Sequence, residues 1–163
     1  MTKIIWITGI SGTGKTTLAK YYLKFLKNFI WIDGDQFRKL FNNDLGYTLH
    51  DRNKNAERLI NFSKFLFEQN NSIIISANLT SKKYKKIIKK KFKNITHINI
   101  DVDFNKLKNR DKKSIYKKNK NVVGKDIKIK KNLKLYDYEI INNGTKKEFL
   151  LYGKKVLNKI NKK

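Results

Sequence analysis

Eight residues near the start of the chain carry its strongest chemical signal. Gly9-Ile-Ser-Gly-Thr-Gly14-Lys15-Thr16 matches G-x-x-x-x-G-K-[ST], a loop whose main-chain N–H groups curl around phosphates. The lysine of such a loop reaches the β and γ phosphates, and its hydroxyl residue binds Mg²⁺. The motif predicts binding of a nucleoside triphosphate without choosing between a kinase, an ATPase and a GTPase. The expected contacts are Gly9, Ser11, Gly12, Thr13, Gly14, Lys15, Thr16 and Thr17.

Two carboxylates follow a short apolar run at residues 29–32, in the sequence Asp33-Gly34-Asp35. At the end of a parallel strand, both would face the bound phosphates. One could hold Mg²⁺ or its waters, and the other could orient an attacking hydroxyl. An Asp-Gly turn with solvated carboxylates is the alternative, but the phosphate loop beside it favours a catalytic pair.

Arginine is scarce in a chain that draws most of its positive charge from lysine, and Arg38, Arg52 and Arg58 follow the two carboxylates. A planar guanidinium binds phosphate or sulfate oxygens in a bidentate way, which an ammonium cannot do. Arg52, Asn55 and Arg58 are spaced by three residues, so on a helix they could converge on one ligand. This spacing favours an anionic acceptor over a neutral nucleoside or antibiotic, although Arg58 could also lie on a solvated helix face.

Alternating strands and helices are expected to position these groups. Apolar runs bounded by glycine or polar residues predict strands, and apolar residues at helical spacing predict helices. The expected strands are 3–8, 29–32, 72–77, 95–100 and 138–141, and the expected helices are 15–26, 51–70, 82–91, a segment with Phe104, Leu107 and Arg110, and 146–159.

This alternation predicts an α/β fold, a three-layer sandwich of the P-loop NTPase type with a parallel sheet of about five strands. Residues 1–163 are expected to form a single domain. The segment at about 112–134 is lysine-rich and weakly periodic, so we expect a lid over the site, with Arg110 at its base approaching the ATP.

The composition narrows the function classes. The chain has no cysteine and two histidines, which argues against disulfides and a zinc centre. The lack of cysteine leads us to expect a cytoplasmic protein, and it should be soluble because no segment has the pattern of a signal peptide or a membrane span. The net charge of +26 raises the question of nucleic acid, but lysine is spread over almost every segment, so a nucleic-acid-binding protein is the remoter alternative.

Four motifs together give the chain a family resemblance. GISGTGKTT, IDGDQFR, DLGYTLHDRNKNAERL and RDKKSIYKK, in this order, resemble adenylylsulfate (APS) kinase over about residues 3–118 and the closing helix. The resemblance implies transfer of the ATP γ-phosphoryl group to the ribose 3′-hydroxyl of a nucleotide, with ATP and Mg²⁺ required. It implies catalysis by Lys15, Asp33 and Asp35, a metal held by Thr16 and Asp33, and an acceptor docked on Asp35, Arg38, Arg52 and Asn55.

The chain departs from the family pattern where the acceptor base should bind. The resemblance puts Asn78 and Val122 at two positions where the family has phenylalanines that sandwich adenine. Their absence would forfeit stacking of about 1 to 3 kcal/mol per base, while the Asn78 amide suits a base edge.

The smaller base of cytidine diphosphoramidate, the acceptor of a related branch in capsule-sugar modification, would suit these changes. The preferred acceptor is therefore cytidine diphosphoramidate, with APS as the alternative. Thr80 stands where the family has a phosphorylatable serine and is expected to be structural. A homodimer is a further expectation.

Overall fold

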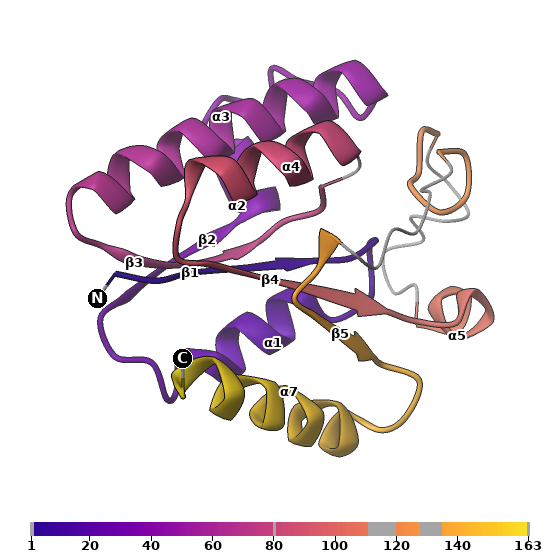
Figure 1. The fold of residues 1–163 in the computed structure, drawn as a ribbon. Helices are drawn as coiled ribbons and strands as arrows, with labels where there is room; N and C mark the ends of the chain where they lie inside the picture. The colour runs from indigo at the N-terminus through magenta and orange to yellow at the C-terminus, as the bar shows by residue number, and fades with distance from the viewer. Residues whose placement is uncertain (1, 80, 111–119, 128–134, 163) are drawn as a thin grey trace.

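A computed structural model describes residues 2–79, 81–110, 120–127 and 135–162. Its centre is a parallel sheet of five strands in the order β2-β3-β1-β4-β5 (Figure 1). The sheet confirms the fold class expected from the sequence. The strands are β1 (Ile4–Thr8), β2 (Phe29–Asp33), β3 (Ser72–Ser76), β4 (Ile95–Asp101) and β5 (Tyr138–Ile141).

Helices cover both faces of the sheet and make the outer two layers (Figure 1). One face carries α1 (Lys15–Tyr22) and α7 (Lys146–Asn161), and the other carries α2 (Gly34–Lys39), α3 (Leu49–Glu68) and α4 (Lys82–Lys91). The short helix α5 (Phe104–Asn109) lies beyond the carboxyl end of β4.

The central strand β1 shows why the sheet strands are continuous apolar runs. All five of its residues are buried. Ile4 and Trp6 pack in the core under α3 and α4, whereas Ile5 and Ile7 pack in the core under α1 and α7. A strand buried on both faces has no solvent side on which polar residues could alternate.

Side-chain caps set several helix starts. Thr48 accepts a hydrogen bond from the Asp51 N–H at the start of α3. Thr145 and Glu148 form a reciprocal capping box at the start of α7. Both helices therefore begin where their polar cap residues stand, and the observed bounds of α3 and α7 differ from the expected ranges by two residues at most at each end.

One helix prediction was wrong in its end, and one helix was missed. The expected helix at 15–26 ends at Tyr22, where i→i−3 turn bonds from the N–H groups of Lys24 and Phe25 to the carbonyl oxygens of Tyr21 and Tyr22 take over. Asn28, in the left-handed region with φ 63°, then redirects the chain into β2. The helix α2 was not expected, because Asp-Gly-Asp resembles a turn. Asp33 caps it by accepting from the N–H groups of Asp35 and Gln36.

The expected lid at 112–134 is described only over residues 120–127, where N–H groups of Lys125, Asp126 and Ile127 converge on the Val122 carbonyl. The rest of the lid and Thr80 lie outside the described residues. In the part of the chain that the structure describes, no helix combines the length and apolar character needed to cross a membrane.

Candidate active site

The loop between β1 and α1 has the backbone of a phosphate cradle. Gly9, Gly12 and Gly14 have φ of 151°, 80° and 104°, a region that L side chains rarely adopt. A Cβ added at Gly9 would lie 2.6 Å from the Ile100 carbonyl oxygen, so a side chain there would clash with the neighbouring strand. The loop ends at Gly14, the N-cap of α1, where main-chain N–H groups and the helix dipole favour an anion.

The Lys15 ammonium is held inside this loop. Its Nζ donates to the Ile10 carbonyl oxygen at 2.9 Å. Burial lowers the pKa of Lys15 to about 8, although the Asp35 and Asp33 carboxylates oppose this and Arg52 adds to it. The Asp33 and Asp35 carboxylates and the Arg52 guanidinium therefore all act electrostatically on the ammonium group of the phosphate loop.

Asp33 accepts hydrogen bonds on both carboxylate oxygens. Its Oδ2 accepts from the hydroxyls of Thr16 at 2.8 Å and Ser76 at 2.9 Å. Its Oδ1 accepts from the N–H groups of Asp35 at 3.1 Å and Gln36 at 3.2 Å. A carboxylate has about four lone-pair sites, so Asp33 is fully occupied and orients the Thr16 hydroxyl. Ser76 is a site residue that the sequence analysis missed.

The Asp35 carboxylate differs from that of Asp33. Asp35 is exposed, and its side chain makes no hydrogen bond or ion pair with the described residues. It is therefore available to an incoming hydroxyl or to metal-bound water, close enough to Lys15 to influence the Lys15 pKa.

The donor set fits Mg²⁺ bound together with phosphates. No group of three histidine, cysteine or acidic residues suited to holding a metal alone occurs among the described residues. Mg²⁺ typically uses one or two protein oxygens and takes the rest from phosphate and water. The Thr16 hydroxyl beside Asp33 supplies such an arrangement.

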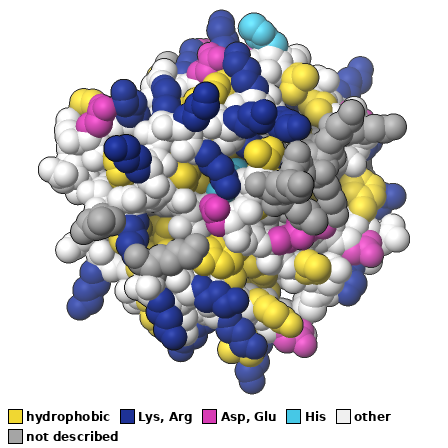
Figure 2. All heavy atoms as spheres, in the orientation of Figure 1, with side chains coloured by type: hydrophobic (Ala, Val, Ile, Leu, Met, Phe, Trp, Pro, Cys, Tyr) yellow, Lys and Arg dark blue, Asp and Glu magenta, His cyan; other side chains and the backbone are white. Residues whose placement is uncertain are grey.

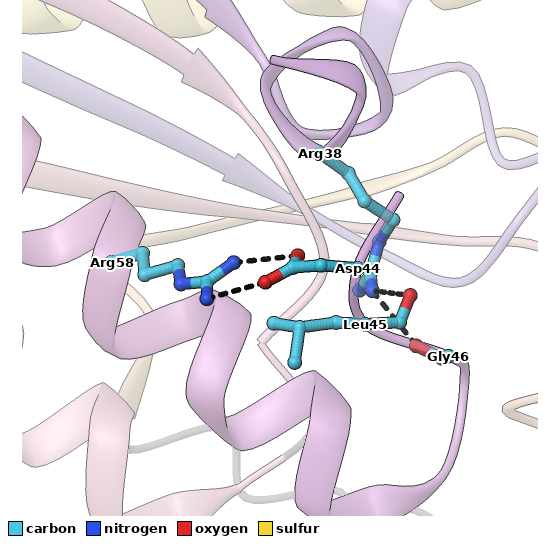
Figure 3. Close-up of polar contacts among 5 residues, drawn as sticks. All are labelled: Arg38, Asp44, Leu45, Gly46 and Arg58. Carbon is cyan, nitrogen blue, oxygen red and sulfur yellow. Dashed lines mark hydrogen bonds and ion pairs between the residues drawn. The ribbon is translucent and has the colours of Figure 1, made fainter. Parts of the chain in front are cut away.

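Arg38 and Arg58 brace the loop that follows α2 (Figure 3). Arg38 is buried, and its Nη1 donates to the carbonyl oxygens of Leu45 at 3.0 Å and Gly46 at 2.8 Å. Arg58 makes a two-pronged ion pair with Asp44 at 2.7 and 2.8 Å. Arg38, which we expected to bind the acceptor, here directs that nitrogen toward its own loop.

Tyr47, in the same loop, lies between two arginines. The guanidinium carbons of Arg38 and Arg52 lie 4.8 Å and 5.3 Å from the Tyr47 ring centroid. Arg52 also donates to the carbonyl oxygens of Tyr47 at 2.9 Å and Asn121 at 3.0 Å. Tyr47 is 50% exposed, so its ring can still be reached by a ligand. The sequence analysis considered only Asn78 and Val122 as base contacts and missed this aromatic residue.

The other residues expected to bind the acceptor differ in burial and in hydrogen bonding. The Oδ1 atoms of Asn55 and of its neighbour Asn53 are buried and have no hydrogen-bond partner among the described residues, which leaves the Asn55 amide available to a ligand. Asn78 is half-buried after β3. Val122 is buried against Val102 and Leu107, so its side chain belongs to a small core and presents no open face to a base.

The expected ATP contact Arg110 is bound to the chain itself. It donates to the carbonyl oxygens of Asn142 at 2.9 Å and Gly144 at 2.9 Å. The buried Asn142 amide in turn donates to the Thr13 carbonyl oxygen at 2.9 Å. Arg110 thus supports the segment after β5, and Asn142, which the sequence analysis did not single out, supports the phosphate loop.

A comparison with protein families matches residues 1–131 to the model of adenylylsulphate kinase. The chain belongs to this family. Among similar proteins, the cytidine diphosphoramidate kinase of Campylobacter jejuni is 36% identical over 141 residues, covering 78% of this chain and 80% of that protein. A probable adenylyl-sulfate kinase of Bacillus subtilis is 33% identical over 127 residues, covering 72% of this chain and 63% of that protein.

Solved structures support the same fold. The Mycobacterium tuberculosis APS kinase, solved in complex with AMPPNP and APS, superposes with a TM-score of 0.87 at 21% identity, covering 99% of this chain and 98% of that one. The adenylylsulphate kinase family and the phosphate loop make this chain an ATP-dependent kinase. The acceptor of the phosphoryl group is a separate question.

Proposed function

We propose that this kinase transfers the γ-phosphoryl group of ATP to the ribose 3′-hydroxyl of an anionic nucleotide, with cytidine diphosphoramidate as the preferred acceptor. The observation that carries the proposal is the position of Arg52, which contacts the half-exposed Tyr47 ring and acts electrostatically on Lys15 of the phosphate loop. Arg52 is close enough to lower the Lys15 pKa, so an anion held by Arg52 would lie next to the ATP phosphates. The 36% identity to the Campylobacter jejuni enzyme supports the choice of acceptor.

The chain's own residues would divide the chemistry as follows. The main-chain N–H groups of Gly12, Gly14 and Thr16 bind the phosphates, and Lys15 moves from the Ile10 carbonyl to the transferred group. Asp35 orients the attacking hydroxyl and accepts its proton. Mg²⁺, held through Thr16, would neutralise charge on the phosphates. Catalysis then consists of in-line positioning and electrostatic stabilisation.

Two residues on the acceptor side, Tyr47 and Asn78, are relevant to which base the acceptor carries. The Tyr47 ring is half-exposed, but the Arg38 and Arg52 guanidinium groups lie over it, so a base would stack there only by displacing one of them. The Asn78 amide can pair with a base edge. Tyr47 therefore does not by itself decide between cytosine and adenine. APS therefore stays the second candidate, supported by the Bacillus subtilis relative.

The deciding experiment assays ATP consumption with cytidine diphosphoramidate and with APS side by side. We expect the larger kcat/KM with cytidine diphosphoramidate. A larger kcat/KM with APS would reverse the order of the two candidates, and no transfer to either would contradict the proposed acceptor class. Transfer to CDP would show that the nitrogen on the terminal phosphorus of the diphosphoramidate is not required.

Two variants test the catalytic assignments. Lys15→Ala and Asp35→Asn should each reduce transfer by about two orders of magnitude or more, the typical effect of removing a charge-stabilising or proton-accepting group. Both should unfold at the wild-type temperature within a few degrees, because Asp35 is exposed and the Lys15 ammonium donates its hydrogen bond to the Ile10 carbonyl of its own loop. Wild-type activity in either variant would contradict its assigned role.

A further inference from the structure

A chain of hydrogen bonds leads from the Thr16 hydroxyl through the sheet to an indole ring. Thr16 donates to Asp33 Oδ2 at 2.8 Å, and Ser76 donates to the same oxygen at 2.9 Å. The Nε1 of Trp31 donates to the Ser76 hydroxyl oxygen at 3.1 Å. Nothing in the sequence motif includes Ser76 or Trp31, so this connection is visible only in the structure.

Strand register brings the three side chains together. Asp33 at the end of β2 pairs with Ser76 at the end of β3. Trp31 precedes Asp33 by two residues, so both side chains point to the sheet face that α1 covers. The arrangement therefore needs no unusual loop geometry, and it is as rigid as the parallel sheet itself.

The donor and acceptor properties of these groups fix the direction of the bonds. An indole N–H can only donate, so it occupies a lone pair of the Ser76 oxygen. Ser76 is buried, which keeps solvent from competing for its proton. The single hydroxyl proton of Ser76 is thus directed at Asp33, and the bond to a carboxylate is of the stronger, charge-assisted kind.

We propose that Ser76 and Trp31 are positioning residues that hold the Asp33 carboxylate in the orientation that receives the Thr16 proton. With its hydroxyl proton donated in a hydrogen bond to Asp33, Thr16 keeps its oxygen lone pairs directed at the site where the nucleotide and its metal would bind. Trp31 acts only through Ser76, and Ser76 acts only through Asp33. This inference depends on the metal-binding role of Thr16 assigned under the proposed function.

The test measures nucleotide binding without any acceptor. Calorimetry gives the Kd of ADP with and without Mg²⁺ for the wild type, Ser76→Ala, Ser76→Thr and Trp31→Phe. We expect Ser76→Ala to weaken binding of Mg-ADP about tenfold, the size of one hydrogen bond to a charged group, and to leave binding of metal-free ADP unchanged. Ser76→Thr restores the hydroxyl and should restore the Mg²⁺ effect.

A double-mutant cycle tests whether Trp31 works through Ser76. Trp31→Phe should weaken Mg-ADP binding two- to threefold on its own and add nothing in the Ser76→Ala background. Ser63→Ala is the matched control, because it removes another buried hydroxyl, one that bonds the Leu59 carbonyl oxygen within α3. Thermal unfolding of every variant checks that the fold is retained.

Trp31 fluorescence provides a second measurement. The difference between wild-type and Trp31→Phe spectra isolates the Trp31 signal from that of Trp6, whose indole N–H is bound to the Ala77 carbonyl oxygen. We expect this signal to change when Mg-ADP binds and not when metal-free ADP binds.

The outcomes distinguish a failure of the metal-binding role of Thr16 from a failure of the positioning role of Ser76 and Trp31. A wild-type protein that binds ADP equally with and without Mg²⁺ would overturn the metal-binding role and, with it, this inference. A clear Mg²⁺ effect that Ser76→Ala leaves intact would overturn the inference alone. Additive effects of Trp31→Phe and Ser76→Ala would show that the indole acts by another route.

Discussion

At the scale of single residues, Lys15 combines burial with a requirement for positive charge. Burial lowers its pKa to about 8, so roughly half of the free enzyme carries a neutral Lys15 near pH 8. Bound phosphates favour the charged form and raise this pKa. Nucleotide binding near pH 8 should therefore take up about half a proton, and much less near pH 7, where Lys15 is already charged.

Calorimetry of Mg-ADP binding in two buffers with different ionisation enthalpies measures this uptake. Lys15→Met removes the titrating group without removing the loop glycines, so its binding, though weaker, should show no proton uptake. Equal uptake in Lys15→Met and the wild type would assign the proton to another group.

His97 makes a second prediction, about stability. Its ring is fully buried, and the Tyr136 ring packs edge-on against it with the ring centroids 5.0 Å apart. Burial and the nearby Lys85 ammonium lower the pKa of His97 to about 3, with Lys89 adding to this effect and Asp137 opposing it. The unfolded chain, with a histidine pKa of about 6.5, then binds one more proton than the native state between these values.

Stability should therefore fall as the pH drops from about 6.5 toward 3, by up to about 1.4 kcal/mol per pH unit from this residue. Urea unfolding at several pH values measures the slope. His97→Phe should remove this contribution, whereas His50→Gln, at an exposed position early in α3, should keep it. An unchanged slope in His97→Phe would show that His97 is not the source of the acid sensitivity.

At the scale of elements, the loop between α2 and α3 depends on contacts from both helices. Arg38 holds the Leu45 and Gly46 carbonyls, and Arg58 holds the Asp44 carboxylate and lowers its pKa (Figure 3). The Arg58–Asp44 pair is partly exposed, and such pairs contribute little to global stability. Its main effect should be local, on the loop that presents Tyr47.

Arg58→Met and Asp44→Asn should therefore each raise the KM of the acceptor several-fold while leaving the KM of ATP and the unfolding temperature nearly unchanged. The double variant should be no worse than either single variant, because the two residues act as one pair. Lys64→Met breaks a comparable ion pair with Glu68 farther along α3 and serves as the control. A matching rise in the KM of ATP would contradict a role confined to the loop.

The candidate site shows which features the sequence could predict and which it could not. Continuous apolar runs predicted every described strand, and the glycine pattern predicted the phosphate loop. Both signals lie within a short stretch of sequence. The contact of Ser76 with Asp33 spans 43 residues and that of Asn142 with Thr13 spans 129, and no local pattern encodes either. Val122 was expected to contact the acceptor base from the family resemblance alone. In the structure its apolar side chain packs with Val102 and Leu107.

At the scale of the whole molecule, the net charge of +26 is spread over many elements. Figure 2 shows lysine and arginine side chains scattered across the face in view, among polar and apolar residues. Exposed lysines occur on helices of both outer layers, for example Lys86 and Lys90 on α4 and Lys154 and Lys155 on α7. Such a field attracts polyanions in general, without marking a nucleic-acid footprint on one element.

This spread of positive charge predicts weak, salt-sensitive binding of nucleic acid. Random-sequence DNA should bind at low salt and release near 0.15 M salt, roughly physiological ionic strength, without inhibiting the kinase. Neutralising two lysines on α4, Lys86→Gln with Lys90→Gln, or two on α7, Lys154→Gln with Lys155→Gln, should weaken the low-salt binding equally. A nucleic-acid-binding protein would instead respond to one pair only and retain tight binding near 0.15 M salt, because a dedicated site neutralises many phosphates with a few clustered side chains.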